Sequence, residues 1–393
     1  MQRDRDIMRN IRLVMLEAVA TSGLMAMAIM TPFFLSIGLN QEEIAFSQMI
    51  FTIAVMVLNV PFGWVADRFG RKWANVVGDL INAVTLLCYS QARTFWQVVA
   101  CETICGVGVA FSQGVDSSLL KHFCDKKDPS GDYFKRKFAT MAMWEQIASL
   151  TLMLLGGPIG AISFRLAIAL SSVTRFIGAV LSLFIEDDSP RIEKSERNVF
   201  WQMGDIVTES LHKRSLRIRI IAYAVAREST HGIIWVFTPL MLAVGVPISI
   251  VSVGWVANYL AASLSAFVAK KYAVNLKDWQ NFIIPILLVS SASLVMFFHL
   301  NVITIWLYVL FGMAQGWSSA TAMPMVKEYV SAEKQASVES FAHVFAQLLY
   351  IIAVWIINRV ADLDVRYALL ATVAIFLPIA IPVAFCLNKK APK

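Results

Sequence analysis

Ionisable side chains stand inside long apolar stretches of this sequence, where each is costly unless it has a partner or a function. The group comprises Glu17, Asp79, Glu102, Asp116, Glu145, Glu228 and Glu339 among acids, Arg175 and Arg227 among permanent cations, and His231 and His343. Because the acids outnumber the arginines, some carboxyl groups lack a cation, and such a carboxyl holds a proton near neutral pH. The pattern predicts a route for protons or for a cationic substrate.

The elements that must position these side chains are long apolar blocks. The chain has 393 residues, of which 58% are hydrophobic and only 16% are charged, whereas soluble domains carry about 25% charged residues. Blocks of about twenty apolar residues are long enough to cross a bilayer. We predict twelve spanning helices, at 11–37, 43–66, 73–91, 95–120, 138–158, 163–185, 218–240, 248–269, 282–300, 302–326, 335–357 and 367–388. A soluble enzyme, a nucleic-acid binder and a disordered scaffold are excluded.

The basic residues predict the orientation of these spans. With the N-terminus inside, 28 of the 34 Lys and Arg residues fall in inner segments and four in outer loops. Short cytoplasmic loops collect Lys and Arg, so both termini are expected in the cytoplasm. The net charge of +7 follows from this bias and does not require an acidic partner.

The cysteine and glycine patterns predict neither a cofactor nor a metal. The five cysteines are Cys88, Cys101, Cys105, Cys124 and Cys386, an odd number without a CxxC pair. Cys101 and Cys105 share a helical face, but two thiols without further ligands make a poor metal site. A glycine-rich phosphate loop ending in GK[ST] does not occur, so ATP is not expected to drive the protein.

The longest polar interval, 186–217, divides the chain into a half at 1–185 and a half at 218–393. Apolar residues recur within it at three- and four-residue steps, at Val199, Phe200, Met203, Ile206, Val207 and Leu211. This spacing predicts an amphipathic helix on the inner membrane surface, and a solvated linker is the alternative.

One charged motif lies between the second and third predicted spans, at Gly63, Asp67, Arg68, Gly70, Arg71 and Lys72. The glycines allow a close helix approach and a tight turn. Asp67 can accept hydrogen bonds from the N-terminus of a neighbouring helix, and the basic residues hold the loop inside.

This motif, in the register 63–72 of a twelve-span chain, resembles the loop signature of the major facilitator superfamily. The resemblance implies two six-helix bundles around a central cavity and transport by alternating access. It also implies that the loop latches the two halves, with Asp67 facing the helix that begins near 335 and Arg71 paired with Asp116. A charge cluster that only fixes topology is the alternative. Other sequence motifs of this family are altered here, and Glu102 stands where the family usually has an arginine. These differences suggest a divergent bacterial member.

By the same resemblance, Glu17, Glu102, Glu145, Arg227, Glu228 and His231 lie on helices that line the cavity. Glu102 and Glu145 are the preferred proton sites, and hydrogen bonds between packed helices are the alternative for each. Arg227 either binds an anionic group or forms a structural ion pair. Glu339 and His343, near the inner end of their helix, are expected to gate, and Trp144 and Trp235 could contact the substrate.

We therefore expect an all-α transporter that acts as a monomer in a bacterial inner membrane. The expected activity is proton-coupled export of a small amphipathic drug or metabolite by antiport. An uptake symporter or uniporter for a small organic anion is the first alternative. A membrane-embedded enzyme or a sensor is a remote one, because the histidines are scattered and no stretch is long enough for a soluble domain.

Overall fold

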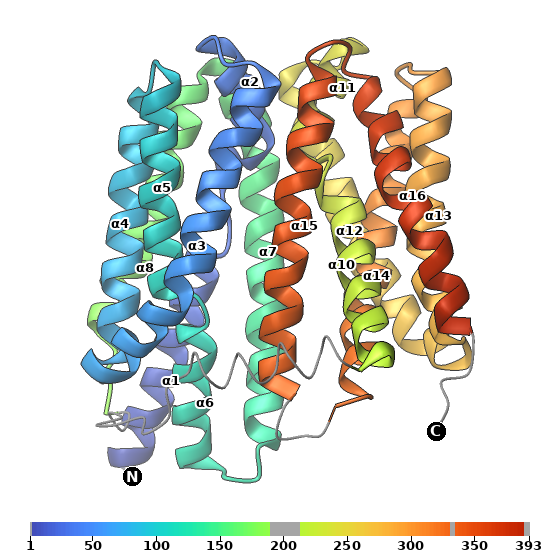
Figure 1. Ribbon diagram of the computed structural model, residues 1–393. Helices are drawn as coiled ribbons and strands as arrows, with labels where there is room; N and C mark the ends of the chain where they lie inside the picture. The colour runs from blue at the N-terminus through green and yellow to red at the C-terminus, as the bar shows by residue number, and fades with distance from the viewer. Residues whose placement is uncertain (1, 189–212, 331–334, 389–393) are drawn as a thin grey trace. The chain divides into compact units, whose positions relative to one another are not determined.

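The structure is a computed structural model that describes residues 2–188, 213–330 and 335–388. Over these ranges the regular elements are all helices, and strands are not found. The helices run as long rods joined by short turns (Figure 1). The prediction of an all-α protein is confirmed.

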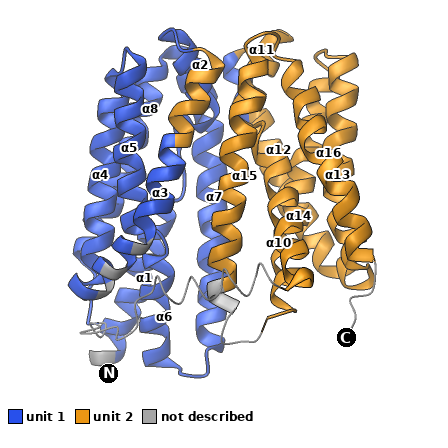
Figure 2. Ribbon diagram, in the orientation of Figure 1, with its two compact units in different colours: residues 1–39, 50–194, 248–252 blue, residues 40–49, 195–247, 253–393 orange. Residues whose placement is uncertain are grey.

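The chain divides into two compact units, shown in different colours in Figure 2. Unit 1 comprises residues 1–39, 50–194 and 248–252, and unit 2 comprises 40–49, 195–247 and 253–393. The helices from the first half of the chain are α1 (Gln2–Thr21), η1 (Met25–Ile29), α2 (Met30–Ser36), α3 (Gln41–Phe69), α4 (Arg71–Gln91), α5 (Phe95–Ser112), α6 (Val115–Lys127), α7 (Asp132–Ile162) and α8 (Phe164–Leu183).

The helices from the second half follow the stretch 189–212. They are α10 (Arg214–His231), α11 (Ile234–Ala243), α12 (Ile248–Tyr272), η2 (Ala273–Asn275), α13 (Asp278–Phe298), η3 (Thr304–Tyr308), α14 (Val309–Lys327), α15 (Gln335–Ala361) and α16 (Tyr367–Asn388). The predicted surface helix within 186–217 falls largely on 189–212, outside the described residues.

Nine helical stretches in the described part of the chain are long and apolar enough to cross a membrane. The other three predicted spans fall on α4, on α10 with α11, and on α14. Helix α4 carries Asn75, Asp79 and Asn82, which lower its hydropathy. The chain breaks at Gly232 and Ile233, so α11 has only 10 residues, and α10 has 18 residues but carries five charged ones, Arg214, Arg217, Arg219, Arg227 and Glu228.

Helix breaks are the main difference from the predicted spans. The predicted helix 11–37 is divided into α1, η1 and α2, and 218–240 is divided into α10 and α11. The predicted helix 95–120 is divided at Gln113 and Gly114, and Gly114 has a φ of +78°. That left-handed conformation favours glycine. Polar runs accompany these breaks, at 21–23, 112–118 and 227–232, but they are too short to divide a span in a hydropathy average over about 19 residues.

Close helix contacts in unit 1 depend on glycine. A Cβ at Gly78 of α4 would lie 2.7 Å from the carbonyl oxygen of Gly108 on α5. A Cβ at Gly108 would lie 2.9 Å from the carbonyl oxygen of Gly78. The two backbones approach each other as small-residue pairs allow in membrane helices.

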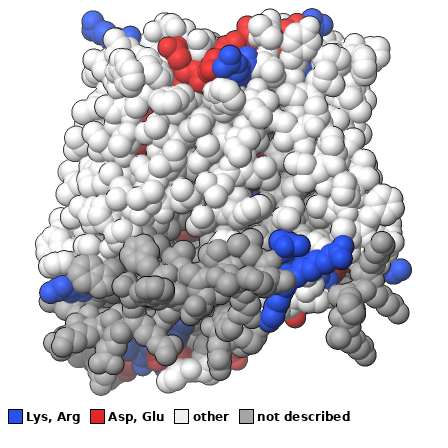
Figure 3. Space-filling model, in the orientation of Figure 1, with Lys and Arg blue, Asp and Glu red and all other residues white. Residues whose placement is uncertain are grey.

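Large apolar side chains cover much of the outer surface, as expected of helices in lipid. Trp96, Phe267, Phe298 and Phe385 expose about 70% of their area, at 71%, 72%, 70% and 67%. In Figure 3 most of the visible described surface is uncharged, and the visible charged side chains gather near helix ends.

The residues that follow α8 are anchored to unit 1. The Glu186 carboxylate lies 3.0 Å from Arg9 Nη1, and Asp188 contacts both His122 and Lys126. Burial alone would raise the pKa of Asp188, but hydrogen bonds from Lys126 and His122 outweigh it and hold this pKa below its ordinary value. Asp187 Oδ2 accepts a hydrogen bond of 3.1 Å from the backbone N–H of Lys72.

Candidate functional site

A cavity lies within unit 2, between helices α10, α14 and α15. Its volume is about 320 Å³, at the lower end of the range for small-molecule sites. The lining residues are Tyr223, Arg227, Thr230, His231, Gln315, Ser318, Ser319, Ala322, Met323, Glu339 and His343. Four of them, Arg227, His231, Glu339 and His343, are site residues that the sequence predicts.

Arg227 is the centre of the polar contacts in this cavity. Its Nη1 lies 2.9 Å from His343 Nδ1 and 3.4 Å from the Tyr223 hydroxyl oxygen. The Tyr223 hydroxyl is itself 2.8 Å from His343 Nδ1. Because a guanidinium can only donate, His343 Nδ1 is the acceptor, and the imidazole is neutral with its proton on Nε2. Arg227 is therefore the charged member of this group of three side chains.

Two acids flank Arg227, and each has a cation beside it. The Glu228 carboxylate is 3% exposed and lies 3.3 Å from Arg227 Nε. The Glu339 carboxylate lies 2.7 Å from Lys327 Nζ and 4.0 Å from His343 Nε2. Glu339 thus joins α15 to the end of α14 at the edge of the cavity. This position agrees with the predicted gating role, which stays a prediction.

His231 is held in one orientation by its own helix. Its Nδ1 lies 2.8 Å from the carbonyl oxygen of Arg227, so Nδ1 carries the proton and donates. Its Nε2 is then free to accept and faces Gln315 Nε2 at 3.4 Å. The side chains of His231 and Gln315 therefore offer both an acceptor and donors to a ligand.

The aromatic residues predicted for the substrate path lie elsewhere. Trp235 on α11 is buried, and its indole N–H donates to the Tyr350 hydroxyl over 3.0 Å. Trp144 on α7 is 50% exposed. Neither residue lines the described cavity of unit 2.

The preferred proton sites, Glu102 and Glu145, lie in unit 1. Glu102 is 6% exposed and accepts a hydrogen bond of 2.7 Å from the Tyr89 hydroxyl, between α5 and α4. Glu145 on α7 is half-buried, and its backbone carbonyl accepts a hydrogen bond from Ser22. Neither acid is among the residues that line the cavity of unit 2, and their proton role stays a prediction.

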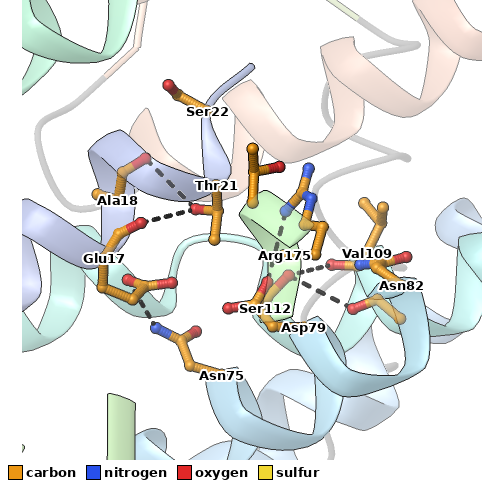
Figure 4. A network of polar contacts seen from close by, with 12 residues as sticks. Glu17, Ala18, Thr21, Ser22, Asn75, Asp79, Asn82, Val109, Ser112 and Arg175 are labelled. Atoms are coloured by element: carbon orange, nitrogen blue, oxygen red, sulfur yellow. Dashed lines mark hydrogen bonds and ion pairs between the residues drawn. The ribbon is translucent and has the colours of Figure 1, made fainter. Parts of the chain in front are cut away.

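A second polar cluster lies inside unit 1, where Figure 4 shows most of its members. Asn75 Nδ2 donates to Glu17 Oε2 over 3.3 Å and also to Asp116 Oδ1. Arg175 Nη1 lies 3.4 Å from Asp79 Oδ1. Glu17 was expected to face the cavity, and here it meets α4 and α6. The predicted pairing of Asp116 with Arg71 stays a prediction.

The charged motif surrounds the turn between α3 and α4. Gly70 has a φ of +111°, which favours glycine, and a Cβ there would lie 3.4 Å from Asp187 Oδ2. Lys72 Nζ donates to the carbonyl oxygen of Leu183 over 2.6 Å. Gly63 and Arg68 are exposed and Arg71 is half-buried, whereas the Asp67 side chain lies outside the described part of the structure.

Several residues of these sites are neutral and were missed from the sequence. Tyr223 stands four residues before Arg227, a spacing that puts both on one helix face and could have identified it. Gln315 and Asn75 are single amides in apolar surroundings, and a search for ionisable groups passes over them. Asp187 was assigned to the linker, and its contact with α4 has no signal in the sequence.

Known proteins share the sequence pattern and the fold of this chain. The family model described as the Major Facilitator Superfamily matches residues 13–354. No curated protein matches the chain significantly. The crystal structure of the nucleoside transporter NupG is similar, with 14% identity, a TM-score of 0.80, and coverage of 98% of this chain and 100% of that chain.

A bacterial homologue of the human lysosomal transporter Spinster, in an inward-facing and unoccupied conformation, is also similar. Its identity is 14% and its TM-score 0.75, over 98% of this chain and 96% of that chain. At such identities the likeness shows the fold alone, and the family match covers most of the chain. This protein is a multi-pass membrane transporter rather than an enzyme, and it belongs to the Major Facilitator Superfamily.

Proposed function

We propose that the chain is a proton-coupled secondary transporter that works by alternating access and binds its substrate in the cavity of unit 2. The observation that supports this is the convergence of Arg227, His343 and Tyr223 on one cavity of about 320 Å³. A permanent cation inside a membrane protein is costly, and its exposure to a cavity favours a binding role. Export in exchange for protons is the activity that we expect.

The lining predicts the chemistry of the substrate. Arg227 offers planar N–H donors to a carboxylate, a phosphate or a carbonyl group. Gln315, His231 and two serines can contact further polar groups, whereas Ala322 and Met323 supply an apolar wall. A small polar compound with an acceptor group and one apolar face fits this lining. Because NupG is a nucleoside transporter, nucleosides belong in the first substrate screen beside small organic anions.

Uptake of a small organic anion, by symport or by uniport, is the second candidate function. Arg227 supports it, because its Nε pairs with Glu228 while its Nη1 lies at the cavity wall, where a guanidinium can donate to an anion. The two functions differ in the direction in which a proton gradient drives the substrate.

The membrane placement is part of the proposal. The excess of basic residues in the predicted inner segments supports cytoplasmic termini. We propose a bacterial inner-membrane location and a monomer with halves at 1–185 and 218–393.

A liposome assay tests the function. The purified protein is reconstituted, and radiolabelled nucleosides and organic anions are screened with and without an imposed pH gradient. Export predicts that substrate moves against the proton flow, and uptake by symport predicts that it moves with the proton flow. Flux without any effect of the gradient would contradict proton coupling.

Variants of Arg227 connect the flux to the cavity. We expect Arg227→Ala to abolish binding of an anionic substrate, and Arg227→Lys to weaken it because the planar fork is lost. Arg93→Ala is the matched control, since Arg93 is exposed in a loop of unit 1. Equal flux in Arg227→Ala and Arg93→Ala would contradict the assignment of the site.

A further inference from the structure

Three carboxyl groups, those of Glu17 on α1, Asp79 on α4 and Asp116 on α6, belong to one polar cluster inside unit 1, and Figure 4 shows Glu17 and Asp79. Glu17 and Asp79 are each only 1% exposed. Glu17 and Asp116 are bridged by Asn75, whose single Nδ2 donates to an oxygen of each. Arg175 on α8 supplies the permanent cation of the cluster, and it contacts Asp79 at 3.4 Å.

The charges of this cluster do not balance if all three acids are ionised. Arg175 is matched to Asp79, and the group that joins Glu17 to Asp116 is a neutral amide. Two carboxylates held together in a buried site cannot both ionise without a large cost, and one of them keeps a proton.

The balance of hydrogen-bond donors and acceptors also indicates one protonated carboxyl group. Asp79 Oδ2 and Asn75 Oδ1 are buried acceptors without a partner among the described residues. An ionised carboxylate can only accept, so a cluster of three carboxylates adds no donor. If one of the three groups is a protonated carboxylic acid, its O–H supplies a donor to a cluster in which these two acceptors have none in the described part of the chain.

The positions of Glu17 and Asp116 indicate which of them is the acid. Asp116 lies in the first turn of α6, after the break at Gly114, and it is partly exposed. The first turn of a helix stabilises negative charge. Glu17 lies within α1, near its end at Thr21, and is almost fully enclosed. The charge therefore belongs on Asp116 and the proton on Glu17.

We infer that Glu17 carries the proton that is coupled to transport and that Asp116 is the carboxylate through which this proton enters and leaves. The inference rests on the proposed proton coupling. In the release step, the O–H bond of Glu17 breaks, the proton forms an O–H bond on Asp116, and water then removes it. The ionisable groups around Glu17 are Asp116 on α6, Asp79 on α4, Arg175 on α8, and Glu145 on α7, which lies within electrostatic range of Asp116.

The same contacts favour a proton over a sodium ion. Sodium requires oxygen ligands, whereas the amide nitrogen of Asn75 faces both carboxylates. A nitrogen that donates two hydrogen bonds occupies the place that a metal cation would need between these oxygens.

Infrared difference spectroscopy tests the inference without any substrate. The purified protein is titrated with acid and base, and the band of protonated carboxyl groups is compared among variants. We expect Glu17→Gln to remove one carboxyl from the titrating band. We expect Asp116→Asn to move the midpoint of that band to lower pH, because the neighbouring negative charge is gone. The exposed residue Glu186 gives the control, Glu186→Gln.

Two results would overturn the inference. One is a titrating band that is unchanged in both Glu17→Gln and Asp116→Asn, or that is lost in Glu102→Gln or Glu145→Gln instead. The other is a band that sodium chloride removes and choline chloride does not, because a sodium ion would then occupy the cluster.

Transport separates this inference from the proposed function. For the substrate found in the liposome screen, Glu17→Gln is expected to keep substrate exchange at equal pH and to lose accumulation driven by a pH gradient. A gradient of one unit drives about tenfold accumulation per proton, so the loss is measurable. A parent protein without proton-driven flux contradicts the proposed function, whereas a coupled parent with a fully coupled Glu17→Gln contradicts only the assignment of the proton to Glu17.

Discussion

The cavity of unit 2 and the polar cluster of unit 1 contain similar side chains in different surroundings. Each has one arginine beside an acid, but the first is open to a ligand and the second is closed. In the cavity, Arg227 stands beside His343 and Tyr223 with space in front of it. In the cluster, Arg175 stands against Asp79, and the carboxyl groups of Glu17 and Asp79 are closed off from solvent. Both arginines contact a buried acid, Glu228 beside Arg227 and Asp79 beside Arg175, but Arg227 also lines a cavity in which a ligand can bind. The comparison suggests that substrate and proton are bound in different halves.

Removing the guanidinium of Arg175 should have the largest effect on stability. We expect Arg175→Met to lower the free energy of unfolding by about 3–5 kcal/mol, because Asp79 would remain buried without a cation. The double variant Arg175→Met with Asp79→Leu should recover part of this loss. Thermal unfolding of the purified protein measures both.

The control for that prediction is Arg359→Met. Arg359 is 57% exposed and pairs with Glu42, so its removal should cost about 1 kcal/mol or less. If Arg175→Met proves no more harmful than Arg359→Met, the cluster of unit 1 is not a closed, charge-balanced site.

Filling the space beside Asp79 should have the next largest effect. A Cβ at Gly178 of α8 would lie 2.9 Å from Asp79 Oδ2 and would also meet Thr21. We expect Gly178→Ala to destabilise the protein by about 1–3 kcal/mol through overpacking. Gly63→Ala is the matched control, because no atom of the described residues lies within 4 Å of its added Cβ. Equal melting temperatures for the two variants would show that the cluster is loosely packed.

A smaller effect is expected from one hydroxyl of the cavity. Tyr223→Phe removes the oxygen that contacts both Arg227 and His343, and a hydrogen bond of this kind contributes about 1 kcal/mol. We expect the KM for substrate to rise about fivefold with little change in stability. Tyr259→Phe, on α12 away from the cavity lining, should leave the KM unchanged. A higher KM for Tyr259→Phe than for Tyr223→Phe would contradict a substrate site at Arg227.

The surface contacts of Asp188 give the smallest expected effect and a baseline for both sites. We expect Asp188→Asn to lower stability by less than about 1 kcal/mol, and less still at high salt. Because the native pKa of Asp188 is lowered, the parent's advantage should be present above the pKa of the unfolded aspartate. It should vanish as the pH falls through the native value. Melting curves of parent and variant across this pH range measure the effect, and a constant difference would exclude ionisation as its cause.

The sequence predicted the helices better than the contacts between them. Blocks of about twenty apolar residues suffice to identify spans such as α13 and α16. They do not reveal breaks such as the one at Gly114, because the polar run 112–118 is short beside a hydropathy window of about 19 residues. The helical content and the family were therefore predictable, and the segmentation of α5 and α6 was not.

The sites were predictable in part for a related reason. An ionisable residue in an apolar stretch stands out in the sequence because burying it in the membrane costs free energy. Arg227, His343 and Glu17 were identified in this way. The partner of each depends on helix rotation and depth, which hydropathy does not fix. Glu17 was expected on a helix that lines the cavity, and the side chain that it contacts, Asn75, is a neutral amide that a search for charged residues does not find. Glu102 was expected on a cavity-lining helix by the family resemblance, and in the structure it contacts Tyr89 between α5 and α4.

The capping of α4 by Asp187 has a practical consequence for dividing the chain. Helix α4 begins at Arg71, and the Asp187 carboxylate, more than a hundred residues later, binds the N–H of Lys72. A first-half fragment that stops at the end of α8 would lose this acceptor and leave an amide at the charged motif without it. Split-transporter and fusion experiments should therefore retain the chain through residue 188.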